Sequence, residues 1–157
     1  MQCIFYIILA NILFSIMLSI FKPLVIDVDM TNWGKSITTS RRPPVGLTIA
    51  PIIFVDLKRA HNLKQTYGFT TDEEAITYLL NHEYIHYKQF MWATPIEFAT
   101  IYGLNTLYLF LTNRITETYY GANIFEAQAV WASLNKKKVD FKYKFISLRT
   151  INNRNTK

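Results

Sequence analysis

Residues 81–89 read Asn-His-Glu-Tyr-Ile-His-Tyr-Lys-Gln and contain the pattern His-Glu-x-x-His. Positions i and i+4 of an α-helix share one face, because the helix turns once in about 3.6 residues. His82 and His86 would therefore point their imidazoles at one spot, where a zinc ion can bind. Glu83 would reach a water on that metal, whose pKa the metal lowers to about 7. The motif predicts zinc-dependent hydrolysis of peptide bonds with Glu83 as the catalytic general base.

Local signals place this motif inside a helix spanning residues 72–92. Thr71 and Glu74 have the spacing of a capping box, and Asp72 and Glu73 add negative charge to the first turn. Apolar residues follow at helical spacing, and no Gly or Pro interrupts the segment. The alternative interpretation is that the pattern arose by chance and the two histidines are ordinary helix residues.

A third metal ligand has to come from elsewhere in the chain. A tetrahedral catalytic zinc site takes three protein ligands and leaves one position for water. His61 is expected to be an exposed residue and not a ligand, so a downstream carboxylate must serve. The candidates are Glu97, Glu117 and Glu126. Glu126 is favoured because residues 122–134 are a predicted helix rich in small residues that can approach the motif helix closely. The alternative for Glu126 is a capping pair with Asn123, which needs no metal.

The positive charge of the chain is concentrated at its C-terminal end. The 157 residues carry a net charge of +6. Residues 136–157 hold 8 Lys or Arg against one Asp, whereas residues 1–135 hold 9 against 10 acidic residues. This distribution predicts a solvated or membrane-surface basic tail and argues against a nucleic-acid-binding core. The single cysteine, Cys3, excludes an intrachain disulfide framework and a cysteine-based zinc site.

The N-terminal segment is uncharged from residue 3 to residue 21. As a helix it would span about 28 Å, which is close to the thickness of the hydrocarbon core of a bilayer. A membrane anchor is favoured for residues 1–22; a secretory signal segment and a buried hydrophobic helix are the alternatives. The basic start and the small-residue cleavage site of a signal peptide are missing. Positive charges follow the segment, which slightly favours a cytoplasmic domain.

The remaining elements predict an α+β domain over residues 23–135. Residues 24–29 and 46–56 are expected to be strands. The second contains Pro51, which cannot donate to a strand ladder, so this strand is expected at a sheet edge or at a bulge. An edge strand could bind an extended peptide by strand addition; an ordinary core strand is the alternative. Residues 95–111 are predicted to form a helix that is apolar nearly all round, hence buried in the domain or immersed in a membrane.

The two motifs together resemble those of a known family. His82-Glu83-x-x-His86 followed by Glu126-x-x-Ala129 resembles the gluzincin branch of the zincin metallopeptidases. A closer resemblance, over roughly residues 45–145, is to small HExxH proteins of Bacteroidetes. The segments that match this second group are Ala50–Val55, Asn81–Gln89 and Tyr120–Ala129.

This resemblance implies a minimal zincin fold, in which a small sheet with an edge strand packs on the motif helix and a second helix carries the glutamate. It implies Zn²⁺ on His82, His86 and Glu126, with Glu83 as the general base. Two positions depart from the pattern. Gln128 stands where the Bacteroidetes proteins usually have a second glutamate, and Val130 where several gluzincins have an aspartate that supports a histidine ligand.

The expected function is that of a membrane-anchored zinc metallopeptidase acting on extended peptides or proteins. Tyr87, Tyr119 or Tyr120 could stabilise the oxyanion by donating a hydrogen bond. One alternative is a non-catalytic zincin-fold membrane or assembly protein whose metal site is degenerate or structural. Another is a helical membrane protein with residues 3–21 and 96–111 both in the bilayer.

Overall fold

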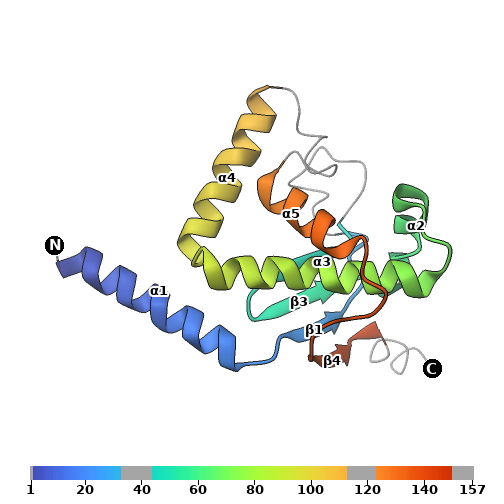
Figure 1. Cartoon of the computed structure of the whole chain (residues 1–157), viewed down its shortest axis with the longest axis horizontal. Helices are drawn as coiled ribbons and strands as arrows, with labels where there is room; N and C mark the ends of the chain where they lie inside the picture. The colour runs from blue at the N-terminus through green and yellow to red at the C-terminus, as the bar shows by residue number, and fades with distance from the viewer. Residues whose placement is uncertain (1, 33–43, 113–122, 150–157) are drawn as a thin grey trace.

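The computed structural model describes residues 2–32, 44–112 and 123–149. In these residues the chain has an α+β fold with five α-helices and one four-stranded mixed sheet (Figure 1). The elements are α1 (Gln2–Ile20), β1 (Leu24–Asp27), β2 (Gly46–Ile49), β3 (Ile52–Val55), the short 3₁₀ helix η1 (Leu57–Arg59), α2 (Asn62–Tyr67), α3 (Asp72–Trp92), α4 (Pro95–Leu111), α5 (Ile124–Ser133) and β4 (Lys144–Ser147). This confirms the α+β class expected from the sequence.

The strands lie in the order β2-β3-β1-β4. β1 runs parallel to both β3 and β4, while β2 is antiparallel to β3. The prediction of one long strand over 46–56 is wrong, because Ile49 pairs with Ile52 and the chain turns back between them. Pro51 lies in this turn, where its missing N–H leaves no ladder position empty. β2 is consequently an edge strand, as the proline suggested for this part of the chain.

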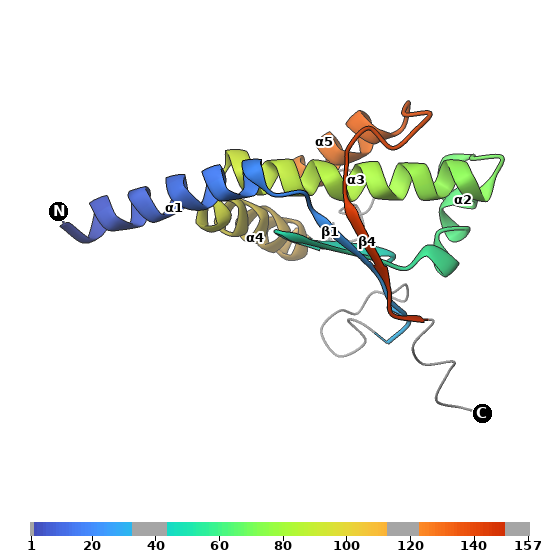
Figure 2. The same ribbon diagram turned by 90° about the horizontal axis from the view of Figure 1, so that it is seen from below.

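The long helix α3 lies across one face of the sheet, and α5 packs on the side of α3 that faces away from the sheet (Figures 1 and 2). Inward-facing residues of the sheet, such as Val25 and Ile53, are fully buried and pack against Leu79 and Leu80 of α3. Burying each such side chain contributes about 1.5–3 kcal/mol. The main hydrophobic core therefore holds the helix that carries the histidine motif against the sheet.

Both ends of α3 agree with the sequence prediction. The Thr71 hydroxyl accepts a hydrogen bond from the Glu74 amide at 3.1 Å, and the Glu74 carboxylate accepts one from the Thr71 amide at 3.2 Å. This is the reciprocal arrangement of a capping box, and the prediction is confirmed.

The C-terminal region contains a strand that the charge pattern did not suggest. β4 extends the sheet beside β1, with Leu24 opposite Lys144 and Asp27 opposite Ser147. The Arg149 guanidinium then pairs with Asp27. The segment from β4 to Arg149 is therefore part of the sheet, although three of the four β4 residues are exposed to solvent.

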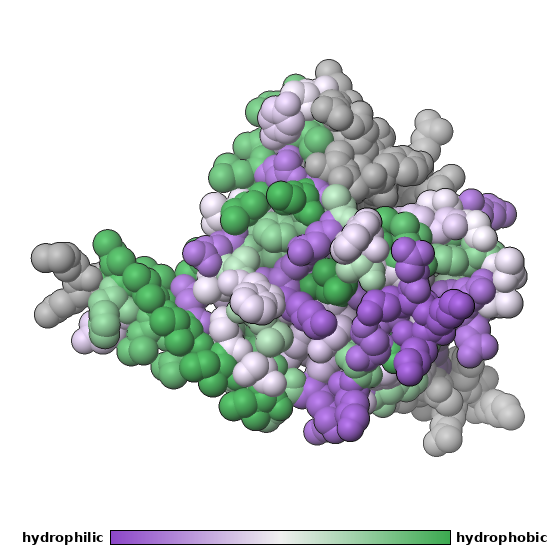
Figure 3. Space-filling view, viewed as in Figure 1, coloured by the Kyte–Doolittle hydropathy of each residue, from purple (hydrophilic) through white to green (hydrophobic). Residues whose placement is uncertain are grey.

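Helices α1 and α4 extend from the same end of the molecule and carry much of its apolar surface (Figures 1 and 3). Only the last turns of α1 join the core, through Phe14 and the buried Leu18. On α4 the buried residues are Phe98 and Leu109, so of the two alternatives for this helix, burial within the domain is wrong and immersion in a membrane stays a prediction. In the described part of the chain, no helix combines the length and the apolar character needed to cross a membrane. Membrane attachment through residues 3–21 stays a prediction.

Candidate metal centre

Asn123 caps the N-terminus of α5, because its side-chain oxygen accepts a hydrogen bond from the Phe125 amide at 3.0 Å. The face of α5 that meets α3 is made of small residues. Ala129 and Ser133 are both fully buried there, so the two helix backbones can approach closely. Glu126, one turn before Ala129, is thereby carried to the histidine face of α3.

Three side chains converge between α3 and α5. His82 Nε2 lies 3.2 Å from His86 Nε2. The Glu126 carboxylate places Oε2 3.3 Å from His82 Nε2 and Oε1 3.4 Å from His86 Nε2. Zinc ligands bound at about 2.0–2.2 Å in a tetrahedral arrangement lie about 3.3 Å from one another. The three residues thus have the donor types of a zinc site, and one ligand atom from each lies within 4.8 Å of the other two, so the residues fit that ion.

Each histidine has a further partner on its other ring nitrogen. Gln89 Oε1 lies 2.8 Å from His86 Nδ1, and the Tyr78 hydroxyl lies 3.4 Å from His82 Nδ1. When Nδ1 carries the proton in such a contact, the Nε2 lone pair is free to bind a metal. Both imidazoles are therefore oriented with Nε2 toward Glu126.

The charges within the cluster favour a carboxylate facing imidazoles. Burial opposes ionisation of Glu126, but hydrogen bonds from His82 and His86 hold its pKa well below the usual range. Burial would lower the pKa of His86, yet the hydrogen bond and charge of Glu126 together with the charge of Glu83 raise it to about 9. The Tyr102 hydroxyl on α4 also donates to Glu126 Oε1 at 3.0 Å. Without a metal, a proton held near His86 compensates the buried negative charge.

Glu83 is buried between α3 and the edge strand β2. The Thr48 hydroxyl lies 2.8 Å from Glu83 Oε2 and 2.9 Å from the Glu83 carbonyl oxygen, so it can donate to either. A Cβ built on Gly46 would overlap this carboxylate, with Glu83 Cδ only 2.6 Å away. Glycine at 46 therefore leaves the space that the carboxylate occupies. Burial raises the pKa of Glu83, against the lowering effect of the His86 and His82 charges and of Thr48.

The other candidates from the sequence are not part of this cluster. Glu97 is exposed at the start of α4, where its carboxylate contacts the Thr94 hydroxyl at 3.1 Å. His61 is exposed, as expected, and its Nδ1 contacts the Lys58 carbonyl. The prediction of Tyr87 as a possible oxyanion donor is wrong, because its buried hydroxyl donates a hydrogen bond to the Leu18 carbonyl at 2.7 Å in the core. The candidates that lie outside the described residues are Glu117, Tyr119 and Tyr120.

Two tyrosines at the site were missed in the sequence. Tyr78 stands one turn before His82, and this i, i+4 spacing is a signal that was available. Tyr102 gives no comparable signal, because its role depends on how α4 packs against α5. Rings of Phe98 and Phe125 join these two helices, with centroids 4.7 Å apart.

The imidazoles of His82 and His86 and the carboxylate of Glu126 can together bind a divalent cation. The buried carboxylate of Glu83 can accept a proton. Among the residues that the structure describes, His82, His86 and Glu126 form the one group of three or more such side chains with metal-binding geometry. No protein-family model, no curated protein and no solved structure matches the chain. Its function has therefore to be inferred from its own residues.

Proposed function

We propose that this protein is a zinc-dependent metallopeptidase with a minimal zincin-like domain. His82, His86 and Glu126 would hold the metal, and Glu83 would act as the general base. The observation that supports this most directly is the convergence of two imidazole Nε2 atoms, 3.2 Å apart, on the carboxylate of Glu126, whose two oxygens lie 3.3 Å and 3.4 Å from one imidazole each. A solely structural zinc site usually has four protein ligands, whereas three leave a position open for chemistry.

Zinc, when bound, supplies a Lewis acid that acidifies water and polarises the scissile carbonyl. The protein contributes the proton acceptor. Glu83 is buried, and its raised pKa makes it a stronger base than an exposed glutamate. The charges of His86 and His82 lower the pKa of Glu83 against the larger effect of burial. In this proposal Glu83 takes the proton from the attacking water and later delivers it to the leaving amine.

The substrate would be a peptide or protein segment in extended form. β2 pairs with β3 on one side, and its other edge pairs with no strand in the described residues. An extended peptide can add to such an edge through main-chain hydrogen bonds. The Thr48 hydroxyl, on β2, lies within hydrogen-bond distance of the backbone carbonyl and of the carboxylate of Glu83, so a peptide bound there would lie close to the general base.

The test is a comparison of Glu83→Gln with the wild-type chain. Zinc content measured by elemental analysis should stay at one ion per chain, while turnover of a mixed peptide library should fall about 100- to 10,000-fold. Glu97→Gln is the matched control, since Glu97 is exposed and lies outside the cluster. Chelation should abolish wild-type activity and zinc should restore it.

Each other outcome has a definite meaning. Undiminished activity of Glu83→Gln would refute Glu83 as the base. A wild-type protein that binds zinc but cleaves no peptide would favour the non-catalytic alternative, in which the metal is structural. A wild-type protein without any zinc affinity would refute the centre itself.

A further inference from the structure

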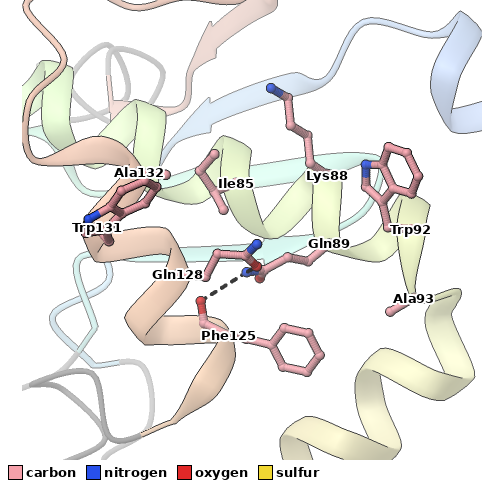
Figure 4. A pocket seen from close by; sticks show the side chains of 9 residues that line it. All are labelled: Ile85, Lys88, Gln89, Trp92, Ala93, Phe125, Gln128, Trp131 and Ala132. Atoms are coloured by element: carbon pink, nitrogen blue, oxygen red, sulfur yellow. Dashed lines mark hydrogen bonds between the residues drawn. The ribbon is translucent and has the colours of Figure 1, made fainter.

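Gln89 connects the metal centre to the helix that carries Glu126. Its side chain is buried, and its Oε1 lies 2.8 Å from His86 Nδ1. Its Nε2 donates to the Phe125 carbonyl at 3.0 Å and to Gln128 Oε1 at 2.8 Å. Gln89 lines a groove of about 280 Å³ between α3 and α5. Figure 4 shows its hydrogen bond to the Phe125 carbonyl and the exposed Trp92 and Trp131 on opposite sides of the groove.

The partners of Gln89 allow only one orientation of its amide. A backbone carbonyl can accept but never donate, so the group facing Phe125 O must be the NH₂ of Gln89. Reversing the amide would place two acceptor oxygens against each other. Gln89 Oε1 is therefore directed at His86, and the only hydrogen bond it can make there is one that His86 Nδ1–H donates.

We propose that Gln89 is a positioning residue, which holds His86 with the proton on Nδ1 and Nε2 directed at the metal, and which couples this orientation to the docking of α5. The proposal rests on the proposed zinc function. A carboxylate commonly supports a metal-bound histidine in this way, whereas Gln89 is neutral and orients the ring without adding charge. Gln128 supports Gln89 from the groove side, because its Oε1 accepts the second amide proton.

The simpler explanation for Gln89 is that it only packs α5 against α3. Substitutions at this one position separate the two roles. Gln89→Leu removes the acceptor for His86 and both donors. Gln89→Glu keeps an acceptor for His86 Nδ1–H but cannot donate to the Phe125 carbonyl, so it retains the positioning role and loses the tie to α5.

The experiment measures zinc affinity of the full chain by competition with a chromogenic chelator. Gln89→Leu should bind zinc about 10- to 100-fold more weakly than wild type, which is the usual effect of losing such a partner. Gln89→Glu should recover most of this loss. Gln128→Ala should lose less than about fivefold, because the Phe125 carbonyl still orients the Gln89 amide. Gln65→Leu, on the exposed surface of α2, is the matched control and should bind as wild type does.

A second readout follows the proton itself. In the zinc-loaded protein, ¹H–¹⁵N correlation spectra of the histidine rings should show a slowly exchanging His86 Nδ1–H in wild type and in Gln89→Glu. The same proton should exchange rapidly in Gln89→Leu. A packing role alone would leave this exchange rate unchanged in a folded variant. Circular dichroism checks folding; if Gln89→Leu does not fold, the spectra of wild type and Gln89→Glu decide.

The outcomes distinguish this proposal from the proposed function. Wild-type affinity in Gln89→Leu, or a rapidly exchanging Nδ1–H in the wild-type protein, would overturn the positioning role and leave the peptidase proposal intact. The expected affinities and spectra in a protein that cleaves no peptide would overturn the peptidase proposal and leave the positioning role intact. A wild-type chain that binds no zinc would overturn both.

Discussion

In the described residues, buried or half-buried carboxylates face positive or protonatable groups in two places, and their charge is balanced differently in each. Asp27 and Asp56 lie at the carboxyl ends of β1 and β3, where the guanidinium of Arg149 pairs with both. Glu83 and Glu126 lie between α3 and its neighbours, where the facing groups are imidazoles and hydroxyls. One cluster is balanced by a permanent cation and the other by groups that can lose their charge.

The donors around the sheet-end cluster leave no room for a ligand. Asp56 Oδ2 accepts from the Met30 amide at 3.0 Å, and its Oδ1 accepts from the Arg59 amide at 3.1 Å and from Arg149. Asp27 is likewise bonded through both oxygens, to the Leu57 amide, Ser147 and Arg149. In the α3–α5 cluster the converging atoms are all acceptors once the imidazoles are neutral, so they require a cation or a proton between them. That requirement separates a binding site from a structural ion pair.

The largest expected effect is the loss of the permanent cation. Arg149→Met would leave the buried Asp27 without its counter-ion and Asp56 with only the Arg59 guanidinium, 3.8 Å away, and should destabilise the fold by about 3–5 kcal/mol. Urea unfolding followed by circular dichroism measures this. Lys136→Met is the control, because Lys136 pairs with Asp140 on the surface and its loss should change stability by less than about 1 kcal/mol. Equal effects of the two substitutions would mean that Arg149 is not a structural counter-ion.

Glu126→Gln makes the corresponding change in the metal centre. Structural zinc sites bind with about 10–16 kcal/mol from four ligands, or roughly 3 kcal/mol for each ligand. Removing one ligand should therefore weaken zinc binding by about 100-fold or more, as measured by chelator competition. Glu97→Gln should leave the affinity unchanged. If Glu126→Gln bound zinc as wild type does, the cluster would be an ion pair like that at the sheet end.

The two clusters should also differ in their response to pH. The pKa of His86 is about 9 in the metal-free fold, against 6.5 ordinarily. Between these two pH values the folded state therefore binds a proton that the unfolded state has lost. The resulting stability is fully present below pH 6.5 and is lost as pH rises through 9, by roughly 2–3 kcal/mol. The raised pKa of Glu83 acts in the same direction above its ordinary value of 4.5. The Arg149 cluster should add no slope in this range, since guanidinium stays charged.

Urea unfolding of the chelator-treated protein at pH 6.5 and 9.5 measures this slope, and His86→Gln should flatten it. With zinc the dependence reverses, because protons must leave the imidazoles before the metal binds, so zinc affinity should rise over the same interval. A metal-free protein whose stability rises from pH 6.5 to 9.5 would contradict the charge state inferred for His86.

The sequence predicted best what depends on neighbouring residues. The bounds of α3 followed from the capping box at Thr71 and from uninterrupted helical spacing, and both are local. The i, i+4 pair His82 and His86 likewise needs only a regular helix to converge. The choice of Glu126 from three carboxylates depended on small residues, such as Ala129, that permit close helix packing.

The features that escaped the sequence depend on distant parts of the chain. β4 lies beside β1, more than a hundred residues earlier, and the basic composition of residues 136–157 gave no sign of a strand there. Arg149 looked like one more charge in a tail until Asp27 and Asp56 were placed near it. Tyr102 reaches Glu126 only through the crossing of α4 and α5. Such contacts are set by tertiary packing, which single-sequence patterns do not record.

The smallest expected effect is that of Gly46→Ala, which fills the space beside the Glu83 carboxylate. In Gly46→Ala the new Cβ would displace the Glu83 carboxylate, whose Cδ and Cγ lie 2.6 and 2.8 Å from its position. Glu83 is buried and its Cγ would have to move together with its carboxylate, so stability should fall by about 1 kcal/mol, the low end of the cost of overpacking a core. Zinc affinity should stay within about twofold, since no ligand is touched, while kcat should fall about tenfold through misplacement of the base.

Gly103→Ala is the matched control for this substitution. Gly103 lies in α4, and a Cβ added there would meet nothing within 4 Å, so alanine should only improve helix propensity, by about 0.5–1 kcal/mol. Peptide turnover and zinc titration of both variants decide the matter. An unchanged kcat in Gly46→Ala, together with an unchanged zinc affinity, would mean that the position of the Glu83 carboxylate against β2 has no part in the reaction, and the base would then have to be sought elsewhere in the cluster.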